Sequence, residues 1–278
     1  MNILAAATPN NLSSGDGVTS VSAGINGLSC GNTYFTQAEA TNTGGTATGP
    51  VIAFDTGACN LSVLLVDDDD NAPDVRADFA AVLDAAGAGY TVWDTGAGDA
   101  EPLAADLQSY DAVIWFTGDA SGSVTGPSTS SEVALSEFLD AGACLVMSSQ
   151  DYFSVRGLSS LMQGYLGIES AQSNTSQTTA AGNSPEFAGL PPAGSYTLQF
   201  GGGIGNRSDT LTPVATAAAA FQGDVGAIAV QNQEFGFNTL YLGFPFSTLP
   251  GDAERGQVMG AILDYCESVD GIFADSFE

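Results

Sequence analysis

The chain has 278 residues and 44% of them are hydrophobic, a length that suits one large domain or a medium domain with a small one. Its 32 acidic residues against 4 basic ones give a net charge of −28, which excludes nucleic acid and anionic membranes as partners. All four basic residues are arginines, and without histidine or lysine the chain has no Ser–His, Cys–His or histidine–metal chemistry. No apolar stretch reaches the roughly 20 residues of a membrane helix, so membrane insertion is not expected.

Residues 1–59 predict a β-rich N-terminal segment. Alternating runs at 32–41 and 50–57 are typical of strands between Gly-rich turns. The segment is too short for a generous core, so we expect it to pack on the rest of the chain, to be stapled by a disulfide, or to lend strands to a neighbour. Its start, MNILAAATPN, lacks a basic region, yet ILAAATP resembles the end of a secretory signal. A short apolar strand is the alternative interpretation.

Residues 60–278 predict an α/β domain. Apolar strands at 61–66, 90–95, 111–119 and 143–151 alternate with helical patterns at 73–87, 102–110, 130–142 and 158–167. This alternation predicts a doubly wound, mainly parallel sheet with helices on both faces. Beyond a polar loop at 170–187, strands are expected at 195–200, 213–221, 226–233 and 238–244, followed by a helix at 251–269. The last three of these strands are expected to form an antiparallel meander added to the sheet.

Several segments together resemble a known family. They are VLLVDDDDNAPD, YTVWDT, YDAVIWFTGD, LSEFLDAGACLVMSSQDY, DTLTPVA and LYLGFPFSTLP. The chain resembles, over residues 61–269, the flavodoxin-like domain of secreted bacterial proteins, which is related to class I glutamine amidotransferases. The terminal GIFADSFE is similar to a short tail of exported proteobacterial proteins. The resemblance implies a flavodoxin-like fold and a secreted, extracellular or cell-surface location.

The catalytic residues of that family are missing. The family places a cysteine on a Gly-flanked turn after a strand, with a histidine later in the chain. Here Ser148 and Ser149 occupy the comparable place and Cys144 lies at the opposite end of the strand. The acidic run also resembles that of response-regulator receivers, with Asp119 on the phosphoacceptor strand, but the lysine that receivers require is absent. We therefore expect a protein that is not an enzyme.

The four cysteines, Cys30, Cys59, Cys144 and Cys266, favour two disulfides in an exported chain. Three pairings are possible. A Cys30–Cys59 bond would staple the N-terminal segment. Cys144 begins a predicted strand and Cys266 ends the last helix, and because helices run antiparallel to the strands, these two fall at one edge of the sheet. The alternative is that Cys144 and Cys266 are buried free thiols.

Acidic residues follow several predicted strands at their carboxyl ends, where open parallel sheets bind ligands. The candidate metal ligands are Asp67, Asp68, Asp69, Asp70, Asp94, Asp119 and Asp151. Carboxylates from several segments are the ligands that Ca²⁺ and Mg²⁺ require, and Ca²⁺ is favoured for an extracellular protein. The alternative is that one aspartate caps the helix near Pro73 while the others face water.

These features favour a non-enzymatic, secreted structural protein that associates with itself, as a homo-oligomer or filament, by strand addition from residues 1–59. The alternative is a calcium-dependent binding module, either a carbohydrate module or a peptidase-accessory domain. In that case Trp93, Trp115 and Tyr152 are candidates to stack on an extracellular glycan, whereas the favoured alternative is that these aromatics belong to the core. A third class is a hydrolase that uses only carboxylates, with Asp67–Asp70 and either Asp94 or Asp119.

Overall fold

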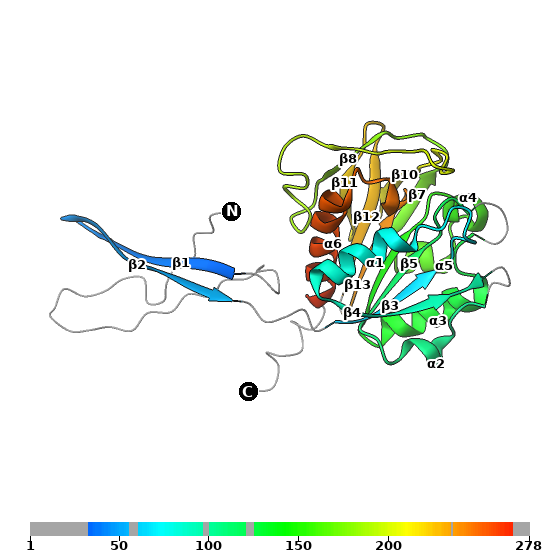
Figure 1. Ribbon diagram of the computed structural model, residues 1–278, viewed down its shortest axis with the longest axis horizontal. Helices are drawn as coiled ribbons and strands as arrows, with labels where there is room; N and C mark the ends of the chain where they lie inside the picture. Colours follow the sequence, from blue (N-terminus) through cyan, green and yellow to red (C-terminus); the bar gives the residue numbers. More distant parts are fainter. Residues whose placement is uncertain (1–32, 56–60, 97–99, 121–124, 235, 269–278) are drawn as a thin grey trace. The chain divides into compact units, whose positions relative to one another are not determined.

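The computed structural model describes residues 33–55, 61–96, 100–120, 125–234 and 236–268 (Figure 1). The chain separates into two compact units, Met1–Gly57 and Ala58–Glu278. None of the described helices is long and apolar enough to cross a bilayer. Cys30 and Cys59, and the apolar start of the chain, lie outside the described residues.

The first unit contains an antiparallel hairpin of β1 (Thr33–Asn42) and β2 (Gly45–Asp55). Thr, Tyr, Phe, Val and Ile favour the pleated backbone. The turn is tight because the Asn42 side chain accepts a hydrogen bond from the Gly44 N–H at 2.7 Å, and Gly45 has a φ of +130° that suits glycine. Tyr34 and Phe54 are opposite each other and their rings stack at 6.0 Å.

The second unit is built on a nine-stranded sheet. Five strands run parallel, in the order β4 (Gly89–Asp94), β3 (Ser62–Asp67), β5 (Ala112–Phe116), β6 (Cys144–Ser148) and β13 (Phe237–Leu242). Antiparallel strands extend the sheet in the order β12 (Ala227–Glu234), β11 (Ala218–Gln222), β8 (Thr179–Gly182) and β9 (Tyr196–Thr197). The parallel part has the flavodoxin-like strand order 2-1-3-4-5, which confirms the predicted fold class.

Helices cover both faces of this sheet. α1 (Arg76–Ala86) and α6 (Asp252–Glu267) share one core and lie side by side (Figure 1). The other core contains α2 (Ala104–Leu107), α3 (Thr129–Asp140), α4 (Tyr152–Arg156) and α5 (Ser160–Gly164). Alternate β3 residues serve the two cores: Val63 and Leu65 face α1, whereas Leu64 and Val66 face the α3 side.

Some predicted elements were wrong. The expected strand at 213–221 is two strands, β10 (Thr210–Pro213) and β11, because a turn at Val214–Ala217 separates them. The expected polar loop at 170–187 contains β8 and the end of β7 (Ile168–Gln172), and β7 pairs with β10. The helix α4 was not predicted. A 3-10 turn at Phe246–Thr248 precedes α6.

A disulfide joins Cys144, at the start of β6, to Cys266, near the end of α6, with the two Cα atoms 5.3 Å apart. Both residues are buried. This is the geometry expected from the antiparallel course of helix and strand, and it excludes the alternative of two free thiols. The Cys30–Cys59 bond stays a prediction.

Replacing Cys144 and Cys266 together by alanine should lower the free energy of unfolding by about 2–5 kcal/mol, because the bond closes a loop of 122 residues in the unfolded chain. Urea unfolding of the oxidised wild type, the reduced wild type and the double variant measures this. The reduced wild type should match the double variant to within about 1 kcal/mol. An oxidised wild type no more stable than the other two would contradict the expectation.

Candidate functional site

The acidic run leaves the sheet at the point where the strand order reverses. β3 lies between β4 and β5, and the chain goes from β3 first to one side and then to the other. Sheets of this type bind ligands outside the carboxyl ends of the two strands at that point. Gly118, just after β5, allows the close approach there: it has a φ of +53°, and a Cβ on it would lie 2.9 Å from that of Asp69.

Asp67 and Asp68 point to opposite faces because they continue the alternation of β3. Asp67 is on the α1 side, where its Oδ2 accepts a hydrogen bond from Nε of Arg76. Asp68 is on the α3 side and accepts hydrogen bonds from Trp115 Nε1 at 2.9 Å and Thr95 Oγ1 at 3.0 Å. These two donors are neutral, and Asp68 is not among the described carboxylates that lie together with Asp67 as possible metal ligands.

Asp69 and Asp74 hold the turn that leads into α1. The buried Asp69 accepts the backbone N–H groups of Asn71 and Val75, each at 2.7 Å. The exposed Asp74 accepts the Arg76 N–H at 3.0 Å. These bonds use backbone N–H groups of the turn and of Arg76, the first residue of α1. Asp69 therefore holds the turn before α1, but no side-chain hydrogen bond caps the helix itself, so the predicted capping aspartate is not found.

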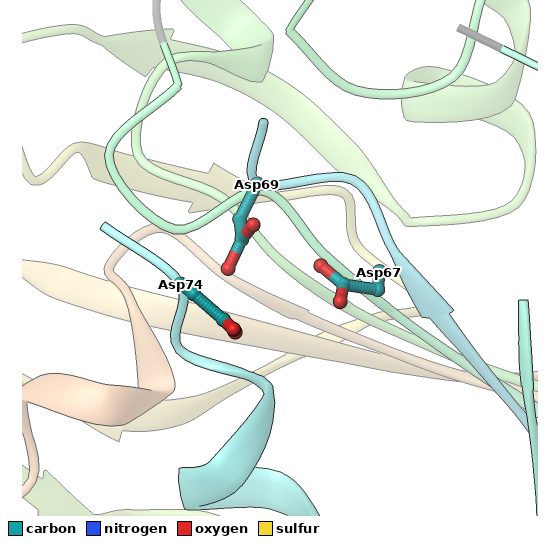
Figure 2. Close-up of side chains that lie close together, drawn as sticks. All are labelled: Asp67, Asp69 and Asp74. Atoms are coloured by element: carbon teal, nitrogen blue, oxygen red, sulfur yellow. The ribbon is translucent and has the colours of Figure 1, made fainter. Parts of the chain in front are cut away.

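Three carboxylates converge beside β3 (Figure 2). Asp67, Asp69 and Asp74 each offer one oxygen, and these oxygens lie within 4.8 Å of one another, so together they could hold a metal ion. We call these three residues the acidic triad. The sequence analysis missed Asp74, although its position directly after Pro73, at the predicted helix start, places it near the end of β3.

Burial is the largest cause that raises the pKa of Asp67 to about 6, from a usual value of 3.8. The hydrogen bond and charge of Arg76 lower that pKa, and the neighbouring Asp69 raises it. Arg76 also binds Asp94 Oδ2 through Nη2. Asp94 is thus linked to the acidic triad through an arginine and is not a member of it.

Asp119 and Asp151 serve a different purpose from the one expected. Both bind Arg207: Nη2 donates to Asp119 Oδ1 at 2.9 Å, and Nε donates to Asp151 Oδ2. Asp119 Oδ1 also accepts from Gly205 N at 2.9 Å and Gln150 Nε2 at 3.0 Å. These bonds fix the segment 201–207 across the carboxyl edge.

Asp70 is exposed in a left-handed turn with a φ of 55°. The seven expected ligands are therefore dispersed, and only Asp67 and Asp69 belong to the acidic triad.

Asp209 is a buried carboxyl that the sequence analysis missed, since one aspartate in a polar loop gives no signal. Its Oδ1 accepts the Asn174 N–H at 3.3 Å, and its Oδ2 has no hydrogen-bond partner within the described residues. Burial, the largest cause, and the charge of Asp151 raise the pKa of Asp209 to about 8, against the lowering effect of the Asn174 N–H.

Ser148 and Ser149 both make structural hydrogen bonds. Ser148 Oγ donates to Phe244 O at 3.1 Å and accepts from Phe246 N at 2.8 Å. Ser149 Oγ accepts from Thr117 Oγ1 at 2.8 Å and from Tyr152 N at 3.2 Å. Trp115 and Tyr152 are fully buried, which agrees with the alternative that they belong to the core and leaves them unable to stack on a glycan.

No family model and no curated protein matches this chain. Two Salmonella typhimurium structures are similar to it, both with a TM-score of 0.48: Cytoplasmic Protein STM3548, at 9% identity over 83% of this chain and 94% of that one, and Cytoplasmic Protein STM1381 of strain LT2, at 10% over 87% and 96%. Exo-beta-1,4-mannosidase Op5Man5 from Opitutaceae bacterium strain TAV5 has a TM-score of 0.45 and 13% identity over 76% of this chain and 36% of its own.

The names of the two Salmonella proteins, both called cytoplasmic, run against the predicted secreted, extracellular or cell-surface location, and that prediction is not carried further.

A divalent cation bound by the acidic triad should raise the melting temperature, because binding to the folded state alone adds about 2.7 kcal/mol at a hundredfold excess over Kd. Asp74→Asn should reduce this increase, since it removes one charged ligand while its amide oxygen can still accept the Arg76 N–H. Calorimetry with Ca²⁺, with Mg²⁺ and with a chelator measures the shift.

General screening of the net charge of −28 also stabilises, so two controls are needed. Sodium chloride at equal ionic strength gives the screening alone. Glu137→Gln, at an exposed position on α3, removes one charge elsewhere and should keep the full shift. Equal calcium shifts in Asp74→Asn and Glu137→Gln would contradict a site at the acidic triad.

The free energy of unfolding should fall between about pH 4 and pH 8 because of Asp209. Its folded-state pKa of about 8 exceeds the usual 3.8, so the stability is fully present below pH 3.8 and is lost as the pH rises through 8. Asp209→Asn should remove much of this fall and be more stable than the wild type at pH 8. Urea unfolding at pH 5 and pH 8 measures it, with the exposed Glu169→Gln as control. Parallel pH curves for all three proteins would contradict it.

Proposed function

We propose that this chain is a non-enzymatic structural protein that associates with copies of itself through the β1–β2 hairpin, and that its flavodoxin-like unit binds a divalent cation at the acidic triad. The observation that carries the proposal is the exposure of large apolar side chains on the hairpin. Phe35 is 72% exposed, Val51 60% and Ile52 57%. Soluble monomers rarely gather such side chains on one small element unless it is an interaction surface.

The apolar side chains occupy both faces of the hairpin. Phe35 lies opposite Ala53, and Ile52 lies opposite Thr36 on the other face. The sheet has two strands in the part of the chain that the structure describes. A two-stranded hairpin is marginally stable in water by itself, and a third strand or a covering layer stabilises it. A second copy of the chain can supply that layer.

Charge favours the hairpin as the contact between copies. Each copy carries a net charge of −28, so most of its surface repels a second copy. Residues 33–55 contain only two acidic residues, Glu39 and Asp55. Contact through the hairpin brings apolar surface together while keeping most of the like charge apart.

Calcium is the ion we propose for the acidic triad. Asp67 already binds Arg76 and Asp69 already binds backbone N–H groups, so an ion would share these carboxylates with those partners. Ca²⁺ accepts irregular coordination by six to eight oxygens, whereas Mg²⁺ demands a near-octahedral set. Asp74 is exposed, which leaves room for water ligands.

The absence of enzyme activity is also part of the proposal. The whole sequence lacks histidine and lysine. Ser148 and Ser149 use their hydroxyls in structural hydrogen bonds, and Cys144 is in a disulfide. None of these side chains is a prepared nucleophile with an adjacent base.

A second candidate function is a calcium-dependent binding module, either a carbohydrate module or a peptidase-accessory domain. The position of the acidic triad favours it, because ligands of this type of sheet bind where the strand order reverses. This alternative predicts a monomer that binds its ligand saturably and loses it on chelation.

Substituting Phe35 and Ile52 together by aspartate should abolish self-association, because the new charges repel the acidic partner copy and remove the exposed apolar surface. Sedimentation velocity over a wide range of protein concentration, with and without a chelator, measures the assembly state. Val133→Asp, at a 55% exposed position on α3, adds a charge elsewhere and should assemble as the wild type does. A monomeric wild type would favour the binding module, and an unchanged assembly of the double variant would contradict the role of the hairpin.

A further inference from the structure

We infer that the outer edge of β4 is the acceptor for β1 of a second copy, so that copies join head to tail by strand addition. The inference rests on the self-association proposed above and names the surface that receives the hairpin. The contact is heterologous, because the hairpin of one copy meets the α/β unit of the next, and such contacts form open polymers or rings.

β4 is the end strand of the nine-stranded sheet. It pairs with β3 alone within the described residues, from Ser62↔Gly89 to Asp67↔Asp94. The next residue, Thr95, directs its N–H to Asp67 O at 3.0 Å. Since backbone groups alternate between the two sides of a strand, those of Tyr90, Val92 and Asp94 point away from β3. Their N–H and C=O groups make no backbone hydrogen bond in the part of the chain described here.

This edge lacks the features that protect natural sheet edges. Exposed edges are normally blunted by lysine, proline, a bulge or extreme shortness. β4 reads GYTVWD, six residues rich in strand formers, with one charge at its last position and no register shift against β3. Val92 is 38% exposed. The opposite edge of the sheet is β9, which has only two residues and is protected by its shortness.

The hairpin fits this edge in charge and in length. β4 has no charge before Asp94, and β1 has one acidic residue, Glu39. Two copies that each carry −28 therefore meet with little local repulsion along these strands. β1 has ten residues, enough to cover the six of β4.

β1 is a better donor strand than β2. The outer edge of β2 contains Pro50, which has no backbone N–H and interrupts a ladder of hydrogen bonds. β1 reads TYFTQAEATN and contains no proline. Added to β4, it would also cover the exposed Val92 with strand-forming side chains.

Val92→Pro tests the acceptor edge. Because the Val92 N–H points away from β3, proline there removes an outward donor and leaves the ladder to β3 intact, which is where edge strands tolerate it. Strand addition loses a hydrogen bond and meets the proline ring, so the apparent association constant should fall about tenfold or more. Val92→Glu adds a negative charge at the same edge. It tests the edge a second time without placing a proline in the strand. Thermal unfolding confirms that each variant is folded.

Mixing the variants distinguishes this inference from the general role of the hairpin. Val92→Pro keeps its donor strand, and the double variant with Phe35→Asp and Ile52→Asp keeps its acceptor edge. At a concentration where the wild type assembles and each variant alone is largely monomeric, their equimolar mixture should form a one-to-one dimer and stop there. In the assembled wild type, amide exchange of Tyr90 and Val92 should be slowed relative to the monomer.

The outcomes separate as follows. If Val92→Pro and Val92→Glu assemble as the wild type does while the hairpin variant does not, the acceptor is elsewhere and the hairpin proposal stands. If the hairpin variant assembles, both ideas fail. If both kinds of variant are monomeric but their mixture gives no dimer, the hairpin does not add to β4 of a second copy, and the inference is wrong.

Discussion

The burial of both faces of the parallel sheet is the constraint on which the rest of the structure depends. Because β3 contributes side chains to a core on each face, successive residues at its end point to opposite faces of the sheet, whether or not a ligand binds there. Asp67 continues the row that faces α1 and meets Arg76. Asp68 continues the other row and meets Trp115. Consecutive aspartates of the run therefore make different contacts on the two faces of the sheet.

A second constraint is the small number of cationic side chains that can pair with the acidic residues. The chain has four arginines, and three of them each bind two aspartates, while Arg156 binds Glu132. Arg76 and Arg207 both act at the carboxyl edge, where they hold Asp94 and the segment 201–207 in place. Of the acidic triad, Asp67 shares Arg76 with Asp94, whereas the ion pairs among the described residues include neither Asp69 nor Asp74. Like charges left together at partly buried positions are where a divalent cation contributes most.

The sequence predicted what depends on local pattern. The continuous apolar run at 61–66 became β3, and the helical spacing at 73–87 became α1. The Cys144–Cys266 pair followed from the course of strand and helix. What it missed depends on tertiary contacts: Asp119 and Asp151 are taken up by Arg207, which is more than 50 residues away in the chain. Asp209 is buried by packing that no spacing reveals.

A pulling force on the polymer would act on the β3–β4 pair but not on the disulfide. In a head-to-tail polymer, tension would enter the α/β unit from the hairpin at the start of β3 and leave it through β4, the adjacent strand. The load would therefore cross one strand pair only. β6 and α6, which the disulfide joins, lie outside that path. Six parallel residue pairs would set the strength of each copy, while the larger part of the fold would bear no tension and stay intact when a link breaks.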